Sequence, residues 1–136
     1  DEWLMAAING VRKEDNVHGG GLSKNLGERL GRYVGWLAYP GVCAVRFEKL
    51  VGPRGGGNEA EQFAEIKRIA AFCGLRLSDE QVLAAGERAF SPRSVTFRKG
   101  QIGDWQNHFE EKHKQAFKTV AGQLLIELGY AESEDW

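Results

Sequence analysis

The segment from Val42 to Phe47 constrains the fold of this chain more than any other feature of the sequence. Its residues, VCAVRF, are mostly apolar, and they follow a helical pattern that stops at Pro40-Gly41. A continuous apolar run of this length after a helix indicates a buried strand of a parallel sheet. One strand cannot form a sheet alone, because its backbone amides and carbonyls need a neighbouring strand. The sequence therefore predicts an α/β fold whose other strands lie outside this chain or in a partner copy.

The other periodic segments of the chain have the pattern of helices. Capping residues, apolar spacing and terminal glycines predict helices over about 1–12, 23–37, 59–72, 79–89 and 104–128. Ser23 is expected to cap the second helix, whose apolar stripe is Leu26, Leu30, Tyr33, Val34 and Leu37. Ser78 and Gln81 have the spacing of a capping box, and Asp104 is expected to cap the last helix. The fold is thus expected to be mostly helical with one strand of parallel type.

Length and charge limit the classes of protein that remain. The 136 residues contain 42% hydrophobic and 27% charged residues, which is ordinary for one globular domain, and a single domain fragment over 1–136 is expected. A net charge of −1 argues against a nucleic-acid partner, and no apolar run approaches the roughly 18 residues of a membrane span. Cys43 and Cys73 are expected to be buried thiols in a reducing compartment, which indicates a cytoplasmic protein. The start at Asp1 without a methionine suggests a piece of something longer.

The loop from Ser94 to Gly100 has the residues that a phosphate dianion requires. Arg98 offers a planar guanidinium, Lys99 a second positive charge, and Gly100 a backbone amide that a ligand can approach closely. Phe97 offers a ring on which an adenine can stack. A solvated basic turn without a ligand is the alternative that spacing alone leaves open.

The same loop resembles a known family motif. Phe97-Arg98-Lys99-Gly100-Gln101-Ile102-Gly103-Asp104-Trp105 is similar to the C-terminal motif of sulfotransferases that use 3′-phosphoadenosine-5′-phosphosulfate (PAPS), an Arg-Lys-Gly followed by Gly-Asp-Trp. Val45-Arg46-Phe47-Glu48-Lys49-Leu50 resembles the family's Arg-Tyr-Glu-Asp-Leu at a strand end. The resemblance covers about Ser23 to Tyr130. It implies the C-terminal part of a P-loop-like, three-layer α/β fold.

The resemblance implies a nucleotide site, residue by residue. The residues expected to bind the cofactor are Phe47, Thr96, Phe97, Arg98, Lys99 and Gly100. Arg98 and Lys99 would pair with the 3′-phosphate, and the amide of Gly100 would complete the cradle. Phe47 replaces the family's tyrosine, so it keeps stacking without the phenol hydrogen bond. Trp105 is expected to pack beneath the loop.

Two parts of the family's machinery have no counterpart in the sequence. The phosphosulfate loop has no match, and no histidine takes the place of the catalytic base. His108 and His113 lie five apart on a helix, are expected to be exposed, and form no zinc motif. No catalytic residue and no metal site are therefore expected here. The implied enzyme moves a sulfuryl group from PAPS to a hydroxyl or amine of a small-molecule acceptor and releases PAP, whereas this chain alone is expected to be inactive.

Other interpretations stay open beside the sulfotransferase one. A non-catalytic helical interaction module of sulfotransferase-like shape, pairing across a dimer through Val42–Phe47, is the alternative function. Weak nucleic-acid binding through Arg93, Arg98 and Lys99 is disfavoured by the net charge. The glycine-rich segment from Gly52 to Gly57 is expected to be a flexible connection, with a backbone phosphate cradle as its alternative.

Overall fold

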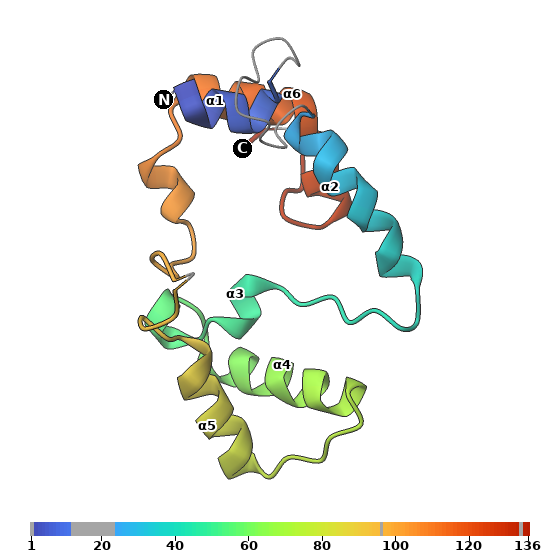
Figure 1. Cartoon of the computed structure of the whole chain (residues 1–136), viewed down its shortest axis with the longest axis vertical. Helices are drawn as coiled ribbons and strands as arrows, with labels where there is room; N and C mark the ends of the chain where they lie inside the picture. The colour runs from blue at the N-terminus through green and yellow to red at the C-terminus, as the bar shows by residue number, and fades with distance from the viewer. Residues whose placement is uncertain (1, 12–23, 96, 134) are drawn as a thin grey trace. The chain divides into compact units, whose positions relative to one another are not determined.

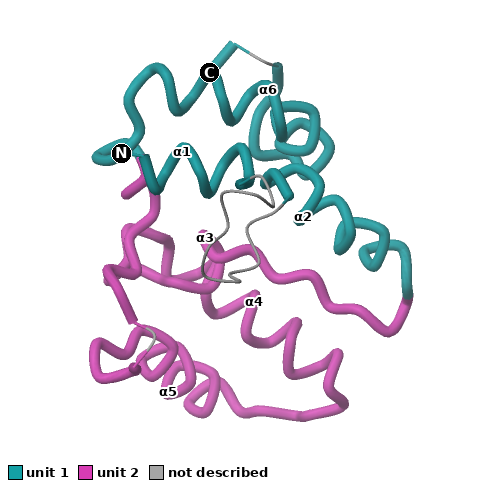
Figure 2. The backbone as a smooth tube through the Cα atoms, turned by 45° about the horizontal axis from the view of Figure 1, so that its top comes forward, with its two compact units in different colours: residues 1–39, 106–136 teal, residues 40–105 magenta. Residues whose placement is uncertain are grey.

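The structure, a computed structural model, describes residues 2–11, 24–95, 97–133 and 135–136. It divides into two compact units, which are coloured separately in Figure 2. Unit 1 contains residues 1–39 and 106–136, and unit 2 contains residues 40–105. The single domain expected over 1–136 stays a prediction, because the structure gives two compact units.

Unit 1 is built from helices at both ends of the chain. Its elements are α1 (Glu2–Asn9), α2 (Leu26–Val34), the 3₁₀ turn η2 (Gly35–Ala38) and α6 (Glu111–Glu127). Both α1 and α2 pack against α6, and all three carry labels in Figure 1. Ile8 of α1 and Ala121 of α6 are 2% and 4% exposed, so the small core of this unit lies between these helices.

The helix predicted over 23–37 is shorter and begins later than expected. Asn25 is its N-cap and forms a capping box with Glu28, whereas Ser23 lies outside the described residues. The apolar stripe predicted for this helix is buried only in part, because Tyr33 and Leu37 are 61% and 48% exposed. Only the first part of α2 approaches α6 closely. A Cβ atom on Gly27 would lie 1.8 Å from the carbonyl oxygen of Val120.

The last helix also begins later than the sequence predicted. Asp104 starts a separate 3₁₀ turn, η4 (Asp104–Asn107), and α6 follows with Glu110 as its N-cap. The Glu110 amide donates to Nδ1 of His113 at 2.9 Å. His113 is 1% exposed, so the prediction of an exposed histidine was wrong. Its ring centroid lies 5.9 Å from that of Phe109. The capping hydrogen bond offsets the cost of removing Nδ1 from water.

Unit 2 contains the two helices that follow the sequence predictions most closely, α4 (Glu59–Phe72) and α5 (Asp79–Ala89). Its other elements are α3 (Phe47–Leu50) and the 3₁₀ turn η3 (Pro53–Gly55). The Ser78–Gln81 capping box is confirmed, and Gly74 ends α4 with a φ of +72°. Helix α4 packs against α3 and α5, with Ile66 and Val82 among the buried side chains.

The predicted strand over Val42–Phe47 is not formed. Residues 42–46 have no regular secondary structure, Phe47 begins α3, and the residues described contain no β-strand. A strand exists only with a neighbour, and here the Arg68 side chain instead donates to the Ala44 carbonyl and, at 3.3 Å, to the Cys43 sulfur. The structure is mostly helical, as expected, whereas the parallel strand and the three-layer α/β architecture are not confirmed.

Each cysteine has a different environment. The prediction of two buried thiols was wrong, because Cys43 is only half-buried, beside Arg68, and Cys73 is exposed. Cys73 is the C-cap residue of α4, so it lies just beyond the end of the helix.

The guanidinium of Arg68 also forms the best-defined ion pair of unit 2. It donates to both carboxylate oxygens of Glu65, at 2.9 and 2.6 Å, and Glu65 is only 7% exposed. These hydrogen bonds, more than the positive charges of Arg68 and Lys49, lower the pKa of Glu65 below its ordinary value although burial opposes them. Arg68 therefore joins α4 to the irregular segment that precedes α3.

We expect the Glu65–Arg68 pair to make the stability of the chain depend on pH. A carboxylate with a lowered pKa in the folded state stabilises the fold above the ordinary glutamate pKa of about 4.3. That contribution is lost as the pH falls through the lower, folded-state pKa. Urea unfolding at about pH 6 should find Glu65→Gln less stable than the parent, and the difference should shrink as the pH is lowered below about 4. A difference that stays the same at every pH would contradict this assignment.

Candidate functional site

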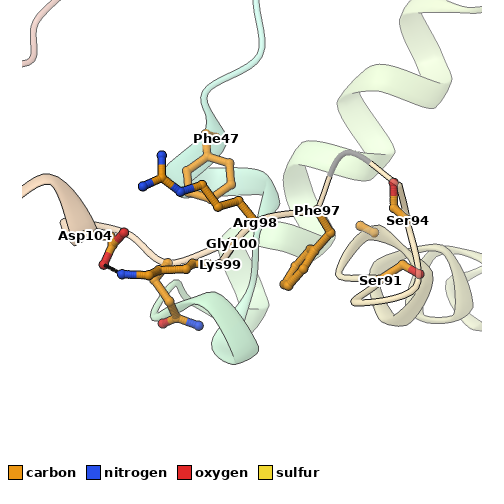
Figure 3. Close-up of a pocket in the computed structure, with 10 residues that line it drawn as sticks. Phe47, Ser91, Ser94, Phe97, Arg98, Lys99, Gly100 and Asp104 are labelled. Atoms are coloured by element: carbon orange, nitrogen blue, oxygen red, sulfur yellow. Dashed lines mark hydrogen bonds and ion pairs between the residues drawn. The ribbon is translucent and has the colours of Figure 1, made fainter. Parts of the chain in front are cut away.

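Unit 2 carries an open pocket of about 440 Å³ formed by the loop after α5, by α3 and by the end of α5 (Figure 3). The lining residues are Phe47, Ala89, Ser91, Ser94, Phe97, Arg98, Lys99, Gly100, Gln101 and Asp104. Five of the six residues predicted to bind a nucleotide thus line one pocket. The sixth, Thr96, lies outside the described residues.

The two cationic side chains of the loop differ in their surroundings. Lys99 Nζ lies 2.9 Å from Asp104 Oδ1, and Figure 3 shows this ion pair on one side of the loop, with Ser91 and Ser94 on the other. Arg98 is exposed and makes no ion pair with any residue that the structure describes. The loop therefore carries one cation balanced by its own carboxylate and one guanidinium open to an anion.

Gly100 is required at its position for two reasons. Its φ of +62° lies in the left-handed region that side chains disfavour. A Cβ atom there would also lie 2.8 Å from Phe90 and 2.9 Å from Phe97, measured to ring carbons. The Gly100 backbone therefore passes directly over two aromatic rings, which leaves its other side toward the pocket.

The two aromatic residues predicted to stack on an adenine are placed differently. Phe97 is half-buried and packs edge-on against Phe90, with ring centroids 5.1 Å apart. Phe47, at the first position of α3, is 47% exposed. Phe47 therefore has more ring surface available to a ligand, whereas Phe97 also supports the loop.

The glycine-rich segment from Gly52 to Gly57 contacts the loop of the site, and sequence reasoning missed this. It is a packed turn rather than a plain connection. The amide of Ile102 donates to the Gly55 carbonyl at 2.9 Å, and the side chain of Gln101 donates to the Arg54 carbonyl at 2.9 Å. Four glycines in six residues were the available signal, since glycine allows close approach of two backbones as well as flexibility.

Trp105 is not buried as predicted. Its side chain is 41% exposed, so it is a partly exposed neighbour of the site. Trp105 belongs to the turn η4, and an element of one turn has no continuous face that packing could bury. Replacement of Trp105 is accordingly not expected to have the cost of removing a buried tryptophan.

The described residues form neither a metal site nor a membrane-spanning helix. In the parts of the chain described here, no group of histidine, cysteine, aspartate or glutamate side chains is arranged to hold a metal ion. Among the described helices, none is long and apolar enough to cross a bilayer.

Comparisons with known proteins agree with the loop motif. The chain is 42% identical over 84 residues to "Sulfotransferase 6B1" of Danio rerio, a match that covers 48% of this chain and 28% of the relative. It is 33% identical over 73 residues to "Cytosolic sulfotransferase 11" of Arabidopsis thaliana, which covers 52% of this chain and 21% of the relative. No family model and no solved structure matches the chain.

These matches confirm the resemblance on which the nucleotide site was predicted. A guanidinium, an ammonium and a glycine turn are groups that anion-binding sites in proteins use. Over about half of its length, the chain is similar to these two sulfotransferases. The matched part spans about a quarter of the length of these curated relatives.

Proposed function

We propose that this chain is the C-terminal portion of a sulfotransferase and that its pocket holds the 3′-phosphate of PAPS or of the product PAP. The observation that carries the proposal is the convergence of Arg98, Lys99 and Gly100 on one pocket that also includes Phe47. The guanidinium and ammonium supply charge for the dianion, and the glycine supplies an amide that a phosphate oxygen can approach.

In this proposal the chain binds and orients the nucleotide but does not perform the chemistry. The adenine lies against Phe47, and Arg98 fixes the 3′-phosphate, so that the phosphosulfate end is held for in-line attack by a hydroxyl or amine of a small-molecule acceptor. The phosphosulfate loop and the catalytic base belong to the remainder of a whole enzyme. We infer that activity requires this remainder, in a cytoplasmic protein.

Calorimetry tests the proposal directly. The chain is titrated with adenosine 3′,5′-bisphosphate and, separately, with 5′-AMP, which lacks only the 3′-phosphate. Tighter binding of the bisphosphate supports the 3′-phosphate site. Equal binding of both nucleotides, or binding of neither by a folded chain, argues against such a site in this chain.

We expect Arg98→Ala to weaken binding of the bisphosphate by about 2 kcal/mol, roughly 30-fold, because it removes a charge-assisted hydrogen-bonding fork. Binding of 5′-AMP should change little. Arg93→Ala is the matched control, since Arg93 is exposed on the same loop but does not line the pocket. An unchanged bisphosphate affinity in Arg98→Ala would remove Arg98 from the site.

A further inference from the structure

We propose that the glycine-rich turn from Gly52 to Gly57 positions the anion-binding loop, with Gly55 as its central positioning residue. This inference rests on the proposed function, because the loop that the turn supports is the one assigned to the 3′-phosphate. It adds a determinant, Gly55, that lies 45 residues before Gly100 in sequence and does not line the pocket.

The first reason is the distance between the two backbones. Gly55 is buried, and a Cβ atom on it would lie 2.4 Å from the carbonyl oxygen of Gly100 and 2.1 Å from Cγ2 of Val51. Gly55 has an ordinary φ, so glycine is needed at this position for close approach and not for backbone conformation. Any side chain here would have to push Gly100 or Val51 away.

The second reason is that the turn holds the loop through both hydrogen bonds and an aromatic contact. The Ile102 amide and the Gln101 side chain donate to the carbonyls of Gly55 and Arg54. The guanidinium carbon of Arg54 lies 4.9 Å from the ring centroid of Phe90, the same ring over which Gly100 passes. The turn therefore contacts the loop directly after Gly100 and also contacts its aromatic support.

The turn itself is fixed within unit 2. The Gly57 amide donates to the Gly52 carbonyl at 2.8 Å, which closes the turn. The buried Gln62 side chain of α4 donates to the Leu50 carbonyl at 2.8 Å and to the Gly86 carbonyl of α5 at 3.3 Å. Because α3, α4 and α5 are all tied to this region, the turn is a suitable rigid reference for the loop.

These contacts have a specific consequence for nucleotide binding. Arg98, Lys99 and Gly100 are consecutive, so a displacement of Gly100 moves the amide and reorients both cationic side chains together. Interactions with a phosphate depend on placement to a fraction of an ångström, whereas stacking of an adenine on Phe47 does not involve this loop backbone. Disturbing Gly55 should therefore reduce discrimination in favour of the 3′-phosphate more than it reduces binding of 5′-AMP.

The test measures the ratio of the two nucleotide affinities in Gly55→Ala. We expect the preference for adenosine 3′,5′-bisphosphate over 5′-AMP to fall at least about tenfold, with 5′-AMP binding retained. Gly56→Ala is the matched control. Its φ of +84° makes the alanine strained in the same turn, but a Cβ atom there would meet nothing within 4 Å, so the preference should be kept.

A second pair of variants separates the two clashes that an alanine at position 55 would cause. Val51→Ala combined with Gly55→Ala relieves the contact with Val51 and leaves the contact with the Gly100 carbonyl. The double variant should still lose the nucleotide preference, and Val51→Ala alone should keep it. A double variant that recovers the preference would overturn the role of the Gly55–Gly100 contact.

Two further readouts cover the remaining outcomes. If Gly55→Ala does not fold, Gln101→Ala, which removes the exposed side-chain hydrogen bond to Arg54 together with one pocket-lining side chain, should lower the preference about two- to threefold. An unchanged preference in every folded variant of this set overturns the inference. If the parent itself shows no preference, the proposed function fails. Amide exchange at Ile102 then tests the turn independently, and only faster exchange in the Gly55 or Gln101 variant supports it.

Discussion

Replacing Gly27 by alanine is expected to lower the free energy of unfolding by about 3 kcal/mol or more, the largest stability loss we predict for a single methyl group. A Cβ atom at this position would lie 1.8 Å from the Val120 carbonyl oxygen, which belongs to the backbone of α6. A backbone atom cannot rotate away as a side chain can. The two helices must therefore separate, and unit 1 loses the contact between α2 and α6.

The same helix supplies a matched control for this prediction. Gly31 also lies in α2, but a Cβ atom there would meet nothing within 4 Å. Gly31→Ala should raise stability by about 0.5–1 kcal/mol, because alanine favours the helix more than glycine does. Urea unfolding followed by circular dichroism measures both variants. Similar stabilities for Gly27→Ala and Gly31→Ala would show that α2 and α6 do not approach so closely.

We expect His113→Ala to cost about 3 kcal/mol, through the cavity it leaves and the loss of the helix cap. The imidazole is 1% exposed, and its Nδ1 accepts the hydrogen bond of the Glu110 amide. His113→Gln should recover about 1 kcal/mol of that loss, because glutamine at this helix position can accept the same hydrogen bond without filling the ring's volume.

The control for this histidine is five residues away. His108 is exposed, so His108→Ala should change the free energy of unfolding by less than about 0.5 kcal/mol. Chemical unfolding near neutral pH compares the three variants with the parent. A His113→Ala protein as stable as His108→Ala would contradict the burial of His113.

The elements that sequence reasoning predicted correctly depend on local signals. Helices α4 and α5 carry their stop and start signals within a few residues, in Gly74 and in the Ser78–Gln81 capping box. The segment Val42–Phe47 has an equally clear apolar pattern, but a strand requires hydrogen bonds from a neighbouring strand. The pattern shows only that the segment could form a strand, and the neighbouring strand has to come from the tertiary structure. Here the Arg68 side chain donates a hydrogen bond to the Ala44 carbonyl instead.

The candidate site likewise has one part that the local sequence predicts and another part that depends on tertiary contacts. The motif around Arg98 and Lys99 is contiguous in sequence, and its resemblance to sulfotransferases was sufficient to predict five residues that line the pocket. The part played by Gly55 depends on its distance to Gly100, which no local pattern encodes. The burial of His113 was missed for a related reason, since its surroundings come from packing around the start of α6.

The division of the chain has a consequence for the order in which it can fold during synthesis. Unit 2 is one uninterrupted stretch, whereas unit 1 is discontinuous and joins the first and last segments of the polypeptide. The pocket-bearing stretch can form all its own contacts once residue 105 has left the ribosome, while α1 and α2 must wait for α6 to emerge. Until then α2 lacks its contact with α6, so the core of unit 1 forms only after the last helix has been made.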